Sequence, residues 1–97
     1  MPEDDIVGPA LNSEGEHYVY ILECRDGTYY TGYTTDVERR VEEHNAGEGA
    51  KYTRSRTPVE VVHVEAYGSK SAAMSREYRI KQFRRSRKER LVGEDAG

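Results

Sequence analysis

Two tyrosine-rich segments flank a short turn signal near the start of the chain, and this arrangement limits the fold more than any other feature. Residues 18–22 read Tyr-Val-Tyr-Ile-Leu, and residues 29–33 read Tyr-Tyr-Thr-Gly-Tyr. Tyrosine, valine and isoleucine all favour strands. The Asp-Gly pair at residues 26–27 favours a reverse turn, because glycine tolerates a positive φ. The sequence therefore predicts a β-hairpin formed by residues 17–24 and 28–33.

The length of the turn decides which side chains share a face of this hairpin. If residues 25–27 form a three-residue loop, Tyr20 lies opposite Gly32. Leu22 then lies opposite Tyr30, and both Tyr20 and Tyr30 point to the same side of the hairpin. A two-residue loop would place the two tyrosines on opposite sides. Tyrosines also pack in strands without any further role, so the cluster alone is compatible with an ordinary core.

Hydrophobic periodicity and capping residues predict the remaining elements. They are, in chain order, a helix at 37–45, a loop at 46–58, a strand at 59–67, a helix at 71–84 and a short helix at 86–92. The order β-β-α-β-α-α predicts an α+β fold, in which a three-stranded, mainly antiparallel sheet is flanked by helices. The strand at 59–67 alternates in hydrophobicity, but the pattern leaves open which of its faces is buried.

A chain of 97 residues suits one domain. We expect a flexible acidic tail at residues 1–16, a folded domain at residues 17–92 and an acidic tail at residues 93–97. No apolar run approaches the roughly 20 residues that span a bilayer, and no signal-peptide pattern is present. Cys24 is the single cysteine, which suits a reducing compartment. These features predict a cytoplasmic protein without membrane association.

The net charge of −3 conceals a strongly basic segment. Residues 70–90 contain nine basic side chains and two acidic ones, whereas residues 1–17 and 93–97 contain seven acidic side chains and no Lys or Arg. An acidic chain with one basic face can bind an anion locally. A charged helix face is more often simply solvated, so the charge pattern alone does not identify a ligand.

Glu77 occupies a position that packing does not explain. The buried side of the second predicted helix is marked by Ala73, Ile80 and Phe83, with Met74 beside them. Glu77 lies on this apolar stripe, and a buried carboxylate is costly unless it is paired or bound to a cation. The pattern leaves three interpretations open: an ion pair, for example with a neighbouring arginine, a boundary position where the carboxylate reaches water, or a metal site.

Arg40 and His44 are four residues apart in the first predicted helix and share one of its faces. Arginine and histidine often point to solvent on such a face. A histidine near the end of a helix can also simply interact favourably with the helix dipole. Taken alone, this pair does not establish a site.

These features occur in a recognisable order along the chain. They are a Tyr-Val-Tyr motif at residues 18–20, a Tyr-Thr-Gly motif at residues 30–32, Arg40 and a helical Glu77. The ordered set resembles the GIY-YIG nuclease superfamily over about residues 17–92. It matches best the small stand-alone, single-domain (UPF0213-like) members. The first motif carries Tyr18 where the superfamily has glycine, as is common among those members.

The resemblance implies a role for each matching residue. Tyr20 and Tyr30 match the motif tyrosines, and either could be the general base that activates water. Arg40 matches the family arginine, whose planar fork can hold two phosphate oxygens. His44 matches a histidine near the scissile phosphate and would assist proton transfer. Gly32 matches the glycine of the second motif, where a side chain would block close approach.

The resemblance also implies one divalent cation. Glu77 matches the metal-binding glutamate and would hold one Mg²⁺ or Mn²⁺, with water and phosphate as the other ligands. The cation would stabilise the leaving oxygen. Tyr33 stands where some repair nucleases have a lysine, so the identity of the general base stays open.

The implied function is metal-dependent hydrolysis of phosphodiester bonds in DNA, including branched or damaged DNA as in repair. Nucleic-acid contacts are expected from Tyr33, Lys51, Arg54 and Arg56, together with the basic segment. Such phosphate contacts follow the structure of DNA rather than its sequence. Two alternatives remain: a nucleic-acid-binding module with little catalysis, and an adaptor that depends on a protein partner.

Overall fold

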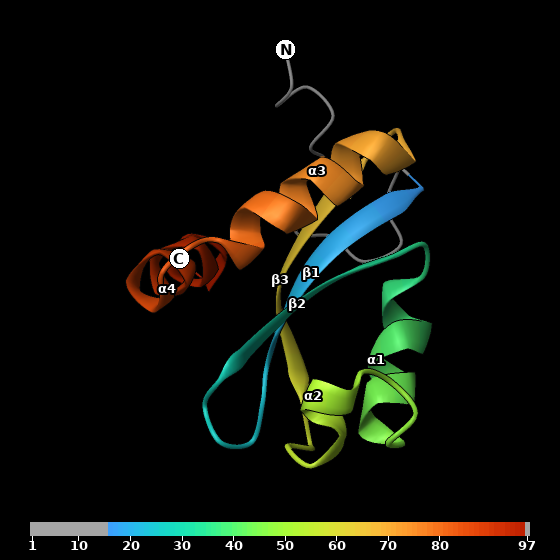
Figure 1. The fold of residues 1–97 in the computed structure, drawn as a ribbon, viewed down its shortest axis with the longest axis vertical. Helices are drawn as coiled ribbons and strands as arrows, with labels where there is room; N and C mark the ends of the chain where they lie inside the picture. The colour runs from blue at the N-terminus through green and yellow to red at the C-terminus, as the bar shows by residue number, and fades with distance from the viewer. Residues whose placement is uncertain (1–15, 97) are drawn as a thin grey trace.

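The computed structural model describes residues 16–96 of the chain (Figure 1). Its elements are, in chain order, β1 (His17–Glu23), β2 (Tyr29–Thr34), α1 (Val37–Asn45), α2 (Lys51–Arg54), β3 (Glu60–Tyr67), α3 (Lys70–Lys81) and α4 (Arg85–Ala96). The predicted α+β fold and element order are confirmed, with the short helix α2 added inside the segment predicted as a loop. Nearly all of the predicted N-terminal tail lies outside the described residues. Within the described range, no helix is long and apolar enough to cross a bilayer.

The three strands form one antiparallel sheet in the order β2-β1-β3. The central strand β1 is buried on both faces from Tyr18 to Leu22. A continuous apolar run suits a strand that is covered on both sides. Accordingly, α1 and α2 lie on one side of the sheet, and α3 and α4 lie on the other (Figure 1).

Alternate residues of β1 supply the two hydrophobic clusters. Toward α1, Tyr20 and Leu22 pack with Val37, and Val41 adds a partly buried contact. The cluster toward α3 consists of Val19, Ile21, Tyr67, Ala73 and Ile80, with Phe83 packed against it. Met74, expected beside the buried side of α3, is instead 42% exposed. The α1 side therefore carries the tyrosine of the first motif, and the α3 side carries mostly aliphatic groups.

The hairpin has the register that a three-residue loop predicts. Tyr20 pairs with Gly32, and Leu22 pairs with Tyr30. The loop closes through a hydrogen bond from the Cys24 backbone N–H to the Thr28 carbonyl, at 2.8 Å. Its glycine at position 27 has a φ of 85°, the left-handed conformation for which glycine is suited.

A register shift in β3 explains why its buried face was ambiguous in the sequence. Ile21 pairs with His63 and Leu22 pairs with Val61, which leaves Val62 as an extra residue without a partner. Such a bulge reverses the alternation at one point along a strand. Strict alternation was therefore the wrong expectation, because the α1-side cluster contains Val59 and Val61 before the bulge but Val64 and Ala66 after it.

Both boundaries of α3 and of α4 also differ from the sequence prediction, and α3 ends at Lys81 instead of residue 84. α3 begins at Lys70, because the Ser69 side chain caps it by accepting a hydrogen bond from the Ala72 backbone N–H. α4 continues to Ala96 instead of ending near residue 92. A single glycine inside a helix costs about 1 kcal/mol, which weakens the helix without ending it.

Glu65 in β3 is buried on the α3 side of the sheet, and its carboxylate forms four hydrogen bonds. Arg76 contributes two of them, from Nε to Oε1 at 2.8 Å and from Nη2 to Oε2 at 3.0 Å. The Tyr67 hydroxyl donates to Oε1 at 2.6 Å, and His63 Nε2 lies 2.8 Å from Oε2. Burial alone would raise the pKa of Glu65, but the hydrogen bonds from His63, Arg76 and Tyr67 outweigh it and lower the pKa to about 2.

Candidate active site

The two motif tyrosines share one face of the hairpin, as the three-residue loop requires. The rings of Tyr20 in β1 and Tyr30 in β2 have centroids 6.4 Å apart. His44 of α1 lies edge-on to both rings, with its centroid 5.9 Å from Tyr20 and 5.2 Å from Tyr30. Helix α1 therefore brings the predicted histidine into contact with both motif tyrosines.

Gly32 makes room for the Tyr20 side chain. The two residues are directly opposite each other in the sheet, and a Cβ at position 32 would run into the Tyr20 hydroxyl. Any other residue would therefore displace the phenol or the strand. The glycine of the second motif is required here for close packing, since Gly32 does not adopt a positive φ.

His44 is buried, and both of its ring nitrogens have partners. Nδ1 lies 2.7 Å from Thr53 Oγ1, whose hydroxyl donates to the Ala50 carbonyl at 3.0 Å. Because a hydroxyl has one proton, Thr53 accepts from Nδ1–H, and Nε2 accepts from the Tyr20 hydroxyl at 3.0 Å. Burial and the nearby charge of Arg40 lower the pKa of His44 from its ordinary 6.5, so the imidazole is neutral at pH 7.

Arg40 lies one helical turn before His44, and its side chain is 31% exposed. Its Nη1 donates to Glu43 Oε1 at 2.8 Å. Burial raises the pKa of Tyr20 to about 12, against the lowering effect of the neighbouring Arg40 guanidinium. The phenol is therefore protonated at neutral pH, and a cation that reaches solvent lies beside it.

Glu77 belongs to α3, which covers the other face of the sheet, yet its charge acts on Tyr20. The negative carboxylate contributes to the raised pKa of that phenol. The Glu77 side chain is only 15% exposed, and its Oε2 lies 3.2 Å from Lys81 Nζ, one turn further along the helix. The structure therefore contains the ion pair that the sequence left open, with a lysine in place of the expected arginine.

The surroundings of Glu77 determine whether a metal could bind there. Between residues 16 and 96, no group of three or more His, Cys, Asp or Glu side chains is arranged to hold a metal ion. Mg²⁺ commonly binds one or two carboxylates and completes its shell with water and substrate phosphates. Lys81 is 48% exposed, so its flexible ammonium can turn to solvent and release the carboxylate. The residues fit a single cation whose coordination the substrate completes.

The rim of the site is formed by α2 and the loop after it. The Tyr52 ring stacks on the Tyr30 ring, with the two ring centroids 6.1 Å apart. The Arg56 guanidinium lies 4.0 Å from the centroid of the Tyr52 ring. Arg56 is also paired with Asp26 of the hairpin loop at 3.1 Å. The remaining two predicted contacts of this segment, Lys51 and Arg54, are exposed on α2.

Tyr33 lies apart from the cluster of Tyr20, Tyr30 and His44. It lies on the α3 side of β2, packed against the aliphatic cluster. Its hydroxyl is 2.8 Å from His17 Nδ1, and the two rings stack. The alternation of side chains along β2 separates Tyr33 from Tyr30.

Three residues that hold the site together were absent from the sequence interpretation. Thr53 fixes the tautomer of His44, and a Cβ at Gly49 would run into the imidazole ring. Asn45 fixes the start of β3 through two hydrogen bonds with the backbone of Val59, at 2.7 and 3.1 Å. A threonine or glycine in a polar loop gives no local signal, because its partner is identified only once the loop has folded onto α1.

Known proteins are similar to this chain over most of its length. Residues 16–90 match the family model for the GIY-YIG catalytic domain. A UPF0213 protein of Natronomonas pharaonis is 67% identical over 82 residues, which is 84% of this chain and 96% of that protein. A UPF0213 protein of Staphylococcus haemolyticus is 56% identical over 79 residues, covering 81% and 96% of the two chains.

Solved structures show the same fold. A UPF0213 protein from Bacillus halodurans, solved by NMR, shares 56% sequence identity with this chain. The two structures match with a TM-score of 0.56, over 84% of this chain and 86% of that one. An NMR structure of a protein from E. faecalis is 43% identical with a TM-score of 0.57, covering 87% and 88%. The family match spans nearly all of the described residues. The chain belongs to the GIY-YIG catalytic domain family.

Proposed function

We propose that the protein is a metal-dependent endonuclease that hydrolyses phosphodiester bonds in DNA, with branched or damaged DNA as its substrates. The observation that carries this proposal is the position of the Tyr20 hydroxyl. It is hydrogen-bonded to neutral His44, lies beside Arg40 and is subject to the charge of Glu77. Packing alone requires none of these neighbours. We place the protein in the cytoplasm, where it would meet DNA.

The Tyr20–His44 hydrogen bond supplies a route for the proton of the attacking water. With a pKa of about 12, Tyr20 is a phenol and not a phenolate at neutral pH. It can accept a proton from water as it passes its own to His44 Nε2, so the proton ends on the imidazole. Tyr30 borders the same imidazole and is the second candidate for contact with water.

Arg40 would bind the phosphate that undergoes attack. Its guanidinium is partly exposed, pairs with Glu43 through Nη1 and interacts with the Tyr20 hydroxyl. A bidentate contact with phosphate oxygens would neutralise charge as the pentacoordinate phosphorus forms. Lys51 and Arg54 on α2 would add contacts with flanking phosphates. Those contacts give affinity without sequence readout.

Glu77 would hold one Mg²⁺ or Mn²⁺ once Lys81 turns away. When bound, the cation supplies Lewis-acid stabilisation of the leaving oxygen. The Glu77 side chain is mostly buried, so this carboxylate would be oriented before substrate arrives. A single carboxylate supports one cation rather than a two-metal centre.

A second candidate function is nucleic-acid binding without catalysis. The observation that favours it is that both charged groups already have partners, Glu77 in Lys81 and Arg40 in Glu43. If these pairs persist when DNA binds, neither group is free for chemistry. An adaptor that acts through a protein partner is the remaining alternative.

Cleavage of labelled branched and linear DNA in Mg²⁺ or Mn²⁺ tests the proposal. The parent is expected to cut, and Arg40→Ala and Glu77→Gln are each expected to lower the rate by about 10²–10³-fold. The matched controls are Arg39→Ala and Glu89→Gln, which change exposed residues of the same type. Salt-sensitive binding without any cutting would replace the enzyme with the binding module, and no binding would favour the adaptor.

A further inference from the structure

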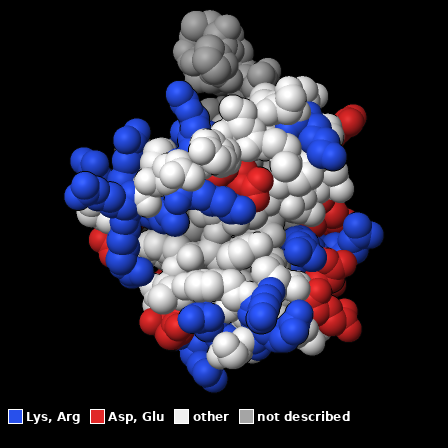
Figure 2. All heavy atoms as spheres, viewed as in Figure 1, with Lys and Arg blue, Asp and Glu red and all other residues white. Residues whose placement is uncertain are grey.

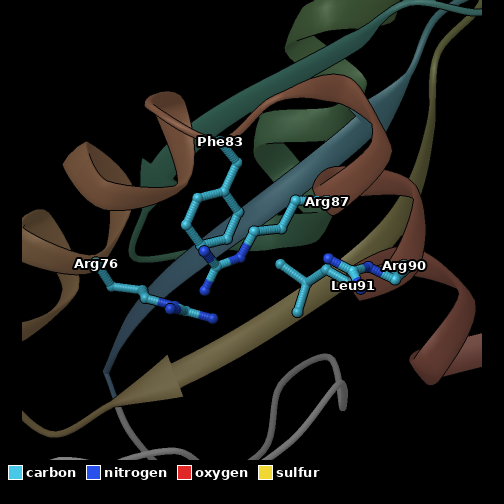
Figure 3. Close-up of a pocket in the computed structure, with 5 residues that line it drawn as sticks. All are labelled: Arg76, Phe83, Arg87, Arg90 and Leu91. Atoms are coloured by element: carbon cyan, nitrogen blue, oxygen red, sulfur yellow. The ribbon is translucent and has the colours of Figure 1, made fainter.

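A basic groove runs between α3 and α4, away from the tyrosine face of the hairpin. Five residues line one of its hollows, of about 250 Å³: Arg76, Phe83, Arg87, Arg90 and Leu91 (Figure 3). A second hollow, of about 420 Å³, shares three of these residues and is completed by Tyr78, Arg79 and Gln82. We call the two hollows together the α3–α4 groove.

The positive charge of this groove is only partly balanced. Arg76 is held by both oxygens of Glu65. Arg79, Arg87 and Arg90 are exposed, and none of them forms a salt bridge with another described side chain. Figure 2 shows Lys and Arg side chains crowded at the left, where Figure 1 places α4. The groove therefore offers an anion several guanidinium groups that have no carboxylate partner among the side chains that the structure describes.

Phe83 organises two of the arginines before any ligand arrives. The Arg87 guanidinium lies 4.1 Å from the Phe83 centroid, and that of Arg76 lies 5.7 Å from it. Figure 3 shows the side chains of Arg76 and Arg87 converging on this ring from the two helices. Cation–π contacts restrict an arginine side chain and leave its N–H groups available to phosphate oxygens. Binding then costs less conformational entropy.

An aromatic surface lies beside these cations. Tyr78 lines the second hollow, and it is 68% exposed, an unusual position for a large ring. Nucleobases stack on such rings when they are not stacked within a duplex, and they do so without sequence preference. An acidic peptide would use the arginines but would gain little from Tyr78. The combination favours a single-stranded nucleic acid over other polyanions.

We propose that the α3–α4 groove binds a single-stranded segment of nucleic acid. Its phosphates contact Arg79, Arg87 and Arg90, and one base stacks on Tyr78. The choice of DNA as the nucleic acid rests on the proposed function. Tyr20, Arg40 and Glu77 are not among the residues that line the groove, so this contact adds to those proposed at the cutting site. A branched DNA substrate could provide one strand for the α3–α4 groove and another for the cutting site.

Fluorescence anisotropy with a labelled oligodeoxythymidylate tests this proposal, in a chelator so that no cleavage is needed. The double variant Arg87→Ala/Arg90→Ala is expected to weaken binding at least tenfold. It should also reduce the slope of log affinity against log salt by about 0.7 for each phosphate that is no longer bound. Arg39→Ala, on α1, is the control for removal of an exposed arginine. Arg76 is left unchanged because it supports Glu65.

Tyr78→Ala tests the stacking interaction, with Met74→Ala as the control for truncating an exposed side chain of α3. Tyr78→Ala should weaken binding of the oligodeoxythymidylate about tenfold and leave binding of a blunt duplex nearly unchanged, whereas Tyr78→Phe should bind like the parent. Circular dichroism of each variant confirms that it is folded.

Several outcomes would overturn the proposal. The first is that the arginine variant and Tyr78→Ala both bind the oligodeoxythymidylate with parental affinity. The second is that Tyr78→Ala weakens duplex and single-strand binding equally. The third is that polyglutamate displaces the labelled oligodeoxythymidylate whereas unlabelled oligodeoxythymidylate does not. If the parent does not cut DNA but these variants fail to bind single strands, the binding proposal for the α3–α4 groove is supported and the nuclease proposal is contradicted. If the parent cuts DNA and the variants bind single strands normally, the nuclease proposal is supported and the groove proposal is contradicted.

Discussion

On the α3 side of the sheet, Glu65 is buried with two hydrogen-bonding partners at each of its oxygens. On the α1 side, Tyr20 and His44 are buried as neutral groups, and the cation next to them, Arg40, is partly exposed. The first cluster stabilises a charge and has no capacity for another partner. The second holds an acid–base pair next to solvent. Burial of polar groups therefore stabilises a charge on one side and supports the proposed chemistry on the other.

The largest effect should follow from removing the charge on the α3 side. Glu65→Ala leaves Arg76 partly buried without its partner, which should cost about 3–5 kcal/mol of unfolding free energy. Urea unfolding measures this change. Glu89→Ala, which removes an exposed partner of Arg85, should change stability by less than about 1 kcal/mol. Equal destabilisation in the two variants would remove the distinction between the clusters.

The pH dependence of stability should report on the same carboxylate. The pKa of Glu65 is lowered from 4.5 to about 2, so its contribution is full above pH 4.5 and is lost as the pH falls toward 2. One pKa unit corresponds to about 1.4 kcal/mol, so roughly 3 kcal/mol should disappear across this window. Urea unfolding at a series of pH values should show this decrease in the parent. The same decrease in Glu65→Gln would assign it to other groups.

On the α1 side, Gly32→Ala should disturb the site through packing. The added methyl group would meet the Tyr20 hydroxyl, and overpacking of this kind costs about 1–3 kcal/mol. Thermal unfolding would measure the destabilisation, and DNA cleavage should fall with it as the phenol moves. Gly68→Ala, where nothing lies within reach of the new Cβ, is the control. Parental stability in Gly32→Ala would show that the hairpin tolerates the shift.

A smaller effect is expected from Thr53→Val, which keeps the shape of the side chain and removes its hydroxyl. His44 Nδ1–H then has no acceptor, at a cost of about 1 kcal/mol of unfolding free energy. The tautomer of the ring would also no longer be fixed, so cleavage should fall more than stability. Denaturant unfolding measures the loss of stability in Thr53→Val, and cleavage assays of the same samples measure the loss of activity. Thr35→Val, at an exposed position, should change neither quantity.

The hairpin could be predicted because the relevant signals are local, and its register follows once the length of the loop is known. The loop at 25–27 lies between its two strands, and the three-residue length alone places Tyr20 opposite Gly32. The position of His44 one turn after Arg40 follows equally from the helix period. The resemblance then related these residues to Glu77, which no local pattern connects to the hairpin.

The parts that could not be predicted depend on contacts between distant segments. Arg76 and Glu65 are eleven residues apart and belong to different elements, so no periodic pattern relates them. The bulge at Val62 breaks an alternation that looked regular in the sequence. Thr53 reaches His44 only because α2 folds back onto α1. Each of these features requires the tertiary fold before it can be recognised.

Tyr20→Phe tests the central claim most directly, because it keeps the packed ring and removes only the hydroxyl that joins His44 to Arg40. The expected result is a fall of about 10²–10⁴-fold in metal-dependent DNA cleavage, with an unfolding free energy within about 1–2 kcal/mol of the parent. Tyr30→Phe, measured in parallel, shows whether the effect is specific to Tyr20. Cleavage by Tyr20→Phe at the parental rate would contradict the account.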